Sequence, residues 1–197
     1  MEKIKSNQKL RQYVDLLLWW NNKMNLIGNS TVEDVWHRHI LDCSQLLEFL
    51  TEEEIEKGKC VDLGAGAGLP GIVLSILGVK HMVLIEKSPL KCKFLREAAK
   101  ISENMVEIVN ENVYEVRNVT YDMVFSRALA NLSELLAMVN SIFKKKTKCI
   151  FLKGKKTTEE IEEAQKHFHF KYELHDSKTS EEGKVVIITK LMDLLFV

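Results

Sequence analysis

The chain has 197 residues, of which 46% are hydrophobic and 28% are charged, and its formal net charge is zero. This length is enough for one domain with a sizeable core, and the composition excludes a mainly disordered chain. The balanced charge excludes a whole-molecule attraction to nucleic acid, so any RNA contact has to come from a local patch.

The cysteines and apolar runs bear on compartment and metal content. The four cysteines form no C-x-x-C pair and have no histidine at zinc-ligand spacing, so we expect a reducing, cytoplasmic environment and no metal. The polar N-terminus predicts no signal peptide, and no apolar run reaches the roughly 18 residues that a membrane helix needs.

The first 50 residues predict a helical extension. Leu10, Tyr13, Val14 and Leu17 fall at helical spacing. Thr31 is the predicted N-cap of a later helix in this region. A charged connector follows at 51–58, so we divide the chain into a helical extension, 1–50, and a larger domain, 51–197.

From residue 59 onward, β-rich runs alternate with helical ones. We predict helices at 70–78, 89–103, 131–143 and 158–167, and strands at 59–63, 82–86, 105–109, 121–125, 148–152, about 168–174 and 184–190. This alternation predicts an α/β fold with a doubly wound, mostly parallel sheet, Rossmann-like, and helices on both faces. The last two strands lack a long helix between them, which predicts an antiparallel strand at one sheet edge.

A glycine-rich turn follows the first predicted strand. Asp62-Leu63 is followed by Gly64, Gly66 and Gly68, and glycine lets the backbone approach a ligand without a Cβ in the way. In open α/β sheets, ligands bind outside the carboxyl ends of the strands, near such a turn. The turn therefore predicts a cofactor site, although a tight turn without a ligand is the alternative.

Two cofactor classes fit this turn. Residues 66–71 match G-x-G-x-x-G, so a dinucleotide-dependent oxidoreductase stays open. S-adenosylmethionine is favoured because the G-x-G-x-G pattern starts two residues after Asp62. Glu86 also closes the second strand, where a carboxylate can accept ribose hydroxyls. Leu69 stands where a dinucleotide fingerprint opened by Gly64 would have a small residue.

Several motifs in the same order resemble one family. Six segments carry the resemblance: 62–71 (DLGAGAGLPG), 25–27 (NLI), 38–42 (RHILD), 86–95 (EKSPLKCKFL), 126–128 (SRA) and 152–154 (LKG). They are similar to motifs of the bacterial ribosomal RNA small subunit methyltransferase G family, also called glucose-inhibited division protein B. The resemblance covers about residues 10–190. It departs at Cys43, where the family usually has serine, and in the C-terminal tail.

The resemblance implies a class I S-adenosylmethionine-dependent methyltransferase. The implied reaction is methyl transfer to N7 of a guanine in 16S rRNA of the small ribosomal subunit. The implied cofactor contacts are Gly64, Leu69, Val113, Tyr114 and Arg127.

The implied chemistry agrees with the residues. Guanine N7 has a free lone pair, so its methylation removes no proton and calls for positioning and electrostatics. Three candidate catalytic residues follow from their positions: Arg127 after the fourth strand, Lys153 after the fifth, and His39 in the extension. The alternatives are a surface salt bridge for Arg127, a solvated lysine for Lys153 and a core histidine for His39.

Local basic residues are the candidate RNA contacts. They are Arg38, Lys91, Lys93, Lys144, Lys145, Lys153 and Lys155. Such groups suit phosphates but carry no sequence information, and a solvated lysine-rich surface is the alternative.

Three other function classes stay open at this point. They are a small-molecule S-adenosylmethionine methyltransferase, a dinucleotide oxidoreductase and a non-catalytic ligand sensor. We predict a monomer.

Overall fold

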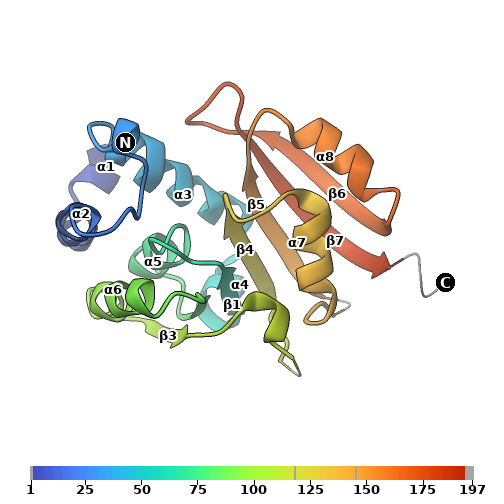
Figure 1. Cartoon of the computed structure of the whole chain (residues 1–197), viewed down its shortest axis with the longest axis horizontal. Coiled ribbons are helices and arrows are strands. Elements are labelled where there is room, and N and C mark those ends of the chain that lie inside the picture. Colours follow the sequence, from blue (N-terminus) through green and yellow to red (C-terminus); the bar gives the residue numbers. More distant parts are fainter. Residues whose placement is uncertain (1, 118, 145, 194–197) are drawn as a thin grey trace.

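The computed structural model describes residues 2–117, 119–144 and 146–193, and shows one sheet between two layers of helices (Figure 1). The strands are β1 (Lys59–Leu63), β2 (His81–Ile85), β3 (Met105–Val109), β4 (Met123–Arg127), β5 (Lys148–Lys153), β6 (Phe168–Asp176) and β7 (Lys184–Asp193). Their order is β3-β2-β1-β4-β5-β7-β6, and β7 runs antiparallel to both neighbours while the first five pair in parallel. The predicted doubly wound, mostly parallel sheet is confirmed.

The helical segments lie before and between the strands. The α-helices are α1 (Glu2–Lys5), α2 (Gln8–Asn21), α3 (Asp42–Ser44), α4 (Glu52–Lys57), α5 (Gly71–Ile76), α6 (Pro89–Ala99), α7 (Leu132–Asn140) and α8 (Thr157–Ala164). Shorter turns of other helix types are η1 (Asn29–Thr31), η2 (Trp36–Leu41), η3 (Gln45–Phe49) and η4 (Val113–Glu115). No described helix is long and apolar enough to cross a membrane.

Each face of the sheet has its own hydrophobic core. The N-terminal helices pack with α5 and α6 on one face, and α7 and α8 cover the other. Side chains alternate along a strand, so in β1 Cys60 belongs to the first core while Val61 and Leu63 belong to the second. Asp62 has the same parity as Cys60, and this places its carboxylate on the face covered by α5.

The N-cap prediction at Thr31 is wrong. Thr31 ends η1, and the next helical segment begins at Trp36 with no side-chain cap. The Thr31 hydroxyl instead donates to Gly28 O (2.7 Å) and lies 2.7 Å from His39 Nε2. The hydroxyl is thus engaged by Gly28 O and His39 and does not cap a helix.

Several element boundaries differ from the prediction: α7 ends at Asn140 rather than 143, α8 ends at Ala164 rather than 167, and β7 ends at Asp193 rather than 190. Two further differences have a visible cause. α6 ends at Ala99 rather than 103, because Ile101 N bonds Ala98 O in a tighter turn. β4 begins at Met123 rather than 121, because the Thr147 hydroxyl donates to Tyr121 O (2.7 Å) just before the strand starts.

The fold brings three distant segments to one edge. The carboxyl ends of β1, β4 and β5 meet there, as parallel strands require. The segment 36–48 and the β6–β7 loop meet each other at this same edge (Figure 1).

Candidate functional site

The glycine turn between β1 and α5 adopts a backbone that other residues resist. Gly64, Gly66 and Gly68 have φ values of 65°, 53° and 76°. A Cβ on Gly64 would lie 2.5 Å from Leu129 Cδ1. Conformation and close approach therefore both require glycine at this position.

Two buried carboxylates support this turn. Asp62 Oδ2 accepts from Gly71 N (2.8 Å), and Glu86 Oε2 accepts from Gly66 N (3.0 Å). Asp62 Oδ1 is buried and has no partner among the described residues. Burial raises the pKa of Asp62 to about 7, an effect that the Gly71 N–H and Arg127 partly oppose. An acceptor of this kind, lying under the turn, is suited to a donor on a ligand.

The N-terminal extension also supports the glycine turn. The fully buried Tyr13 of α2 donates its hydroxyl to Ala67 O at 2.6 Å. Sequence spacing placed Tyr13 only on an apolar face, and no local signal indicated this contact with a residue 54 positions away.

Arg127, at the carboxyl end of β4, lies at the centre of a hydrogen-bonded network. Its Nη1 donates to Arg38 O (3.1 Å) and to Asp42 Oδ2 (3.1 Å), and its Nη2 lies 2.7 Å from His39 Nδ1. The Arg127 and Asp42 side chains are each only 17% exposed. The pairing is therefore a half-buried network and not the surface salt bridge considered as the alternative.

The partners of His39 determine its tautomer. A guanidinium is a donor only, so Nδ1 of His39 accepts from Arg127 and the ring proton is on Nε2. Nε2 then donates to the Thr31 hydroxyl, which donates onward to Gly28 O. Burial lowers the pKa of His39 to about 4, and Arg127 and Arg38 add to the effect. His39 is thus neutral near pH 7 and has two partners.

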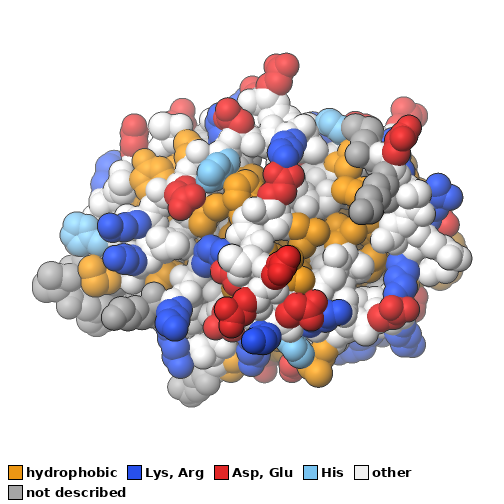
Figure 2. Space-filling model, turned by 180° about the vertical axis from the view of Figure 1, so that it is seen from behind, with side chains coloured by type: hydrophobic (Ala, Val, Ile, Leu, Met, Phe, Trp, Pro, Cys, Tyr) orange, Lys and Arg blue, Asp and Glu red, His pale blue; other side chains and the backbone are white. Residues whose placement is uncertain are grey.

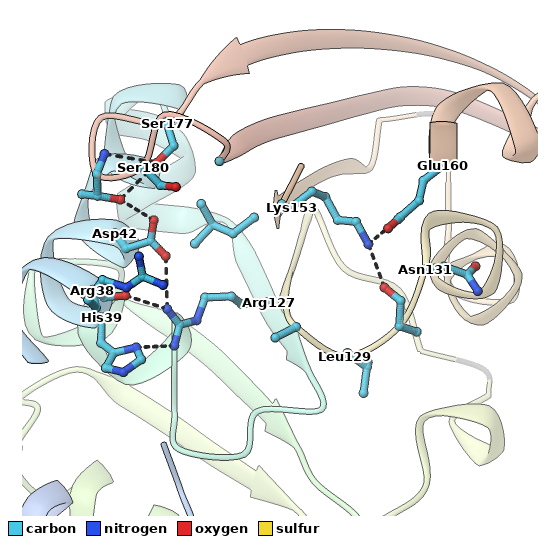
Figure 3. A pocket seen from close by; sticks show the side chains of 16 residues that line it. Arg38, His39, Asp42, Arg127, Leu129, Asn131, Lys153, Glu160, Ser177 and Ser180 are labelled. Atoms are coloured by element: carbon cyan, nitrogen blue, oxygen red, sulfur yellow. Dashed lines mark hydrogen bonds and ion pairs between the residues drawn. The ribbon is translucent and has the colours of Figure 1, made fainter. Parts of the chain in front are cut away.

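A cavity of about 600 Å³ opens beside this network. Figure 3 shows Arg127, His39 and Asp42 on one side and Lys153 and Glu160 on the other. Arg38, Leu152 and Gly154 also line it, and the rest of the wall comes from the β4–α7 loop and the β6–β7 loop: Ala128, Leu129, Ala130, Asn131, Ser177, Thr179, Ser180 and Gly183. Leu129 both lines the cavity and packs on Gly64, so the cavity adjoins the glycine turn.

The β6–β7 loop is fastened to the N-terminal segment. Asp42 Oδ1 accepts from the Thr179 hydroxyl at 2.7 Å. Gln45 Oε1 accepts from Lys178 N at 2.9 Å, and Gln45 Nε2 donates to Ser177 Oγ at 3.1 Å. These bonds join the extension and the last hairpin into one rim of the cavity, and sequence patterns did not indicate them.

Lys153 is paired rather than solvated. Its Nζ donates to Glu160 Oε2 (2.6 Å) and to Ala130 O (2.7 Å), and its side chain is 9% exposed. Sequence reasoning had singled out Lys153 but not Glu160, which lies seven positions further on in α8.

The other expected cofactor contacts follow the first three strands. Leu69 is buried in the glycine turn. Val113 is buried in η4 and Tyr114 is 47% exposed beside it. Their position after β3 places them one strand beyond Glu86, which follows β2.

The basic residues do not form one surface. Lys153 is the last residue of β5, Lys155 follows two residues later, and Arg38 lines the cavity. Lys91 and Lys93 lie in α6 after β2. Lys144 precedes β5 and so lies at the opposite edge of the sheet. Lys145 is outside the described residues.

The charge on the described surface is mixed. Figure 2 shows Lys and Arg interspersed with Asp and Glu on the far face of the molecule. Within the described ranges, no three His, Cys, Asp or Glu side chains gather as a metal site would require.

Comparison with known proteins gives one consistent family. The model of the family described as rRNA small subunit methyltransferase G matches residues 6–187. The chain is 39% identical to the ribosomal RNA small subunit methyltransferase G of Rickettsia rickettsii (strain Sheila Smith) over 95% of this chain and 96% of that one. It is 40% identical to the protein of the same name from Orientia tsutsugamushi (strain Boryong), over 91% and 88% of the two chains.

Solved structures share the fold at low sequence identity. A ribosomal protein L11 methylase from Lactobacillus delbrueckii subsp. bulgaricus superposes with a TM-score of 0.63 at 16% identity, over 83% of this chain and 80% of that one. Magnesium protoporphyrin IX methyltransferase from Synechocystis PCC 6803 gives a TM-score of 0.63 at 12% identity, over 93% of each chain. These two likenesses concern the fold alone.

Proposed function

Because this chain belongs to the rRNA small subunit methyltransferase G family, we propose that it methylates N7 of a specific guanine in 16S rRNA of the small ribosomal subunit, with S-adenosylmethionine as the methyl donor. The observation that carries the proposal is the family match over residues 6–187. This range contains the glycine turn, the Arg127 network and both sides of the cavity.

The residues around the glycine turn fit the cofactor. S-adenosylmethionine, when bound, supplies an electrophilic methyl group. The unpartnered Asp62 Oδ1 offers an acceptor beneath the turn. Glu86 uses one lone pair on each oxygen for Gly66 N and Ser88 N, and an ionised carboxylate has about four such sites. Glu86 therefore retains acceptor capacity toward ribose hydroxyls. We assign cofactor contacts to Asp62, Gly64, Gly66, Gly68, Leu69, Glu86, Val113, Tyr114 and Arg127.

The Arg127 network suits a reaction that needs no general base. Its guanidinium is fixed by Asp42, Arg38 O and His39, and it is directed to the cavity edge. A guanidinium fixed in this way can bind a carboxylate or a phosphate through forked hydrogen bonds. His39 orients Arg127 as a neutral acceptor and moves no proton. Guanine N7 already has its lone pair free, so positioning is the main requirement.

The RNA contacts are assigned to the basic side chains near the cavity. Arg38, Lys91, Lys93 and Lys155 lie around the edge of the sheet where the strands end. Lys144 lies at the opposite edge, so it would contact RNA only if the substrate wraps around the molecule. We further propose that the protein acts as a monomer in the cytoplasm. Light scattering during gel filtration tests the monomer, and cell fractionation tests the compartment.

Transfer of labelled methyl groups to small subunits taken from cells that lack this protein tests the function. The modified position is mapped by borohydride–aniline cleavage, which detects N7-methylguanine. We expect one strong cleavage site, weakened with Gly64→Ala when S-adenosylmethionine is limiting. If S-adenosylmethionine binds but RNA is not labelled, the substrate is wrong and small molecules are tested next. If NAD(H) binds in its place, the methyltransferase assignment fails.

A further inference from the structure

We propose that Glu160 and Lys153 together read the base of the target nucleotide in the cavity, and so discriminate guanine from adenine. This inference rests on the proposed function. The problem it addresses is chemical: N7 is the reacting atom and cannot be used for recognition. On the Watson–Crick edge of the base, the groups that remain for recognition are O6, N1–H and the 2-amino group.

The Glu160 carboxylate has one engaged oxygen and one open oxygen. Oε2 accepts from Lys153 Nζ (2.6 Å) and from Leu132 N (2.9 Å). Among the described residues no donor is bonded to Oε1. The side chain is 23% exposed and lines this cavity together with a neighbouring one, and we place Oε1 at the wall of the first cavity, as an acceptor for the base.

The Lys153 ammonium has one open donor beside it. An ammonium carries three protons, and Lys153 Nζ uses two, toward Glu160 Oε2 and Ala130 O. The two bonds fix the nitrogen at the same wall of the cavity (Figure 3). The third proton and Glu160 Oε1 therefore form a donor and an acceptor side by side.

This pair is complementary to one base edge. Guanine presents the O6 acceptor next to the N1–H donor, which match Lys153 and Glu160 in that order. Adenine presents an N6 donor and an N1 acceptor at the same places. Its N6 donor would then face the Lys153 donor, and its N1 acceptor would face the Glu160 acceptor. A carboxylate beside the base also stabilises the positive charge that the base gains on methylation.

The cavity has the position and size that recognition of a base by Lys153 and Glu160 requires. Its volume of about 600 Å³ lies within the range of small-ligand sites. Leu129 is in contact with Gly64 on one side and lines the cavity on the other. A base in the cavity would thus lie next to the proposed cofactor turn.

Glu160→Gln is the variant that tests base recognition by Glu160. The glutamine oxygen can keep the bonds to Lys153 and Leu132 N, so its amide N–H would face the guanine N1–H. We expect kcat/KM for methyl transfer to fall roughly 10- to 100-fold, the value of one good base contact. The affinity for S-adenosylmethionine, measured by calorimetry, should stay unchanged. Glu159→Gln is the matched control, because Glu159 is exposed and adjacent.

A substrate series tests the same idea on the unaltered enzyme. Small subunits are reconstituted with inosine or adenosine at the mapped position. Inosine keeps O6 and N1–H but lacks the 2-amino group, so we expect it to be methylated within a few-fold of guanosine, while adenosine is rejected. Because this experiment uses the wild-type chain, it stands even if Glu160→Gln fails to fold.

Each outcome has a defined meaning. If Glu160→Gln methylates guanine N7 at the wild-type rate, or inosine is rejected like adenosine, base recognition by Glu160 and Lys153 is refuted and the proposed function stands. If the wild-type chain labels no RNA while binding S-adenosylmethionine, the proposed function fails and base recognition falls with it.

Discussion

The hydrogen bond from Tyr13 to Ala67 O predicts a measurable link between the N-terminal extension and the glycine turn. Tyr13→Phe removes a buried donor at 2.6 Å and leaves the Ala67 carbonyl without that partner. A lost hydrogen bond that strands a buried acceptor costs about 1–3 kcal/mol. We therefore expect the free energy of unfolding to fall by that amount, and Tm to fall by roughly 2–4 °C for each kcal/mol in a chain of this size.

Urea denaturation followed by circular dichroism measures the change. The m-value should stay constant, because the substitution alters little exposed surface. Tyr172→Phe is the control, since Tyr172 is 42% exposed on β6, and its effect should stay within about 0.5 kcal/mol. If Tyr13→Phe is no more destabilising than this control, Tyr13 does not support the turn.

The remaining predictions concern the site itself. Gly64→Ala places a methyl group 2.5 Å from Leu129 Cδ1 at a φ of 65°. Because the backbone strain is about 1–2 kcal/mol, the affinity for S-adenosylmethionine, measured by calorimetry, should fall roughly 10-fold. An unchanged affinity would contradict the assignment of this turn to the cofactor. His39 should titrate with a pKa of about 4 by NMR. In the unfolded chain the same histidine binds a proton near pH 6.5, so the free energy of unfolding should decrease as the pH falls from 6.5 to 4. A measured pKa of His39 near 6.5 in the folded protein would show that the histidine is not buried in its neutral form. Arg127→Lys keeps the positive charge but removes the paired N–H donors of the guanidinium, so kcat/KM should fall roughly 10-fold or more. Full activity of this variant would show that Arg127 has no positioning role.

The fold could be predicted from local patterns in the sequence. Alternating β-rich and helical runs predicted the sheet, and the turn after Asp62 predicted where the strands' carboxyl ends present a site. Both depend on interactions between residues close in sequence. The Thr31 cap was wrong because the hydroxyl donates to Gly28 O and accepts from His39 Nε2 instead.

The side chains that complete the site could not be predicted in the same way. The Glu160 carboxylate is held by Leu132 N, 28 residues away, and the Asp42 carboxylate by Thr179, 137 residues away, and no periodicity marks such pairs. The candidate RNA-binding lysines show the opposite error, in which residues close in sequence are taken to lie on one surface. Lys144 and Lys153 are close in sequence, but Lys144 precedes the six-residue strand β5 and Lys153 ends it. At roughly 3.3 Å per residue, the two ends of this strand lie about 17 Å apart.

The bonds between Asp42 and the β6–β7 loop have a consequence for the order in which the protein is made. The Thr179 hydroxyl and Asp42 Oδ1 are separated by 137 residues, so nearly the whole chain must leave the ribosome before they meet. The glycine turn and the first five strands are synthesised earlier and can pack as they emerge. One wall of the cavity is thus completed only when the final hairpin closes on the N-terminal segment. A nascent chain halted before Gly183 would carry the cofactor turn but no closed cavity.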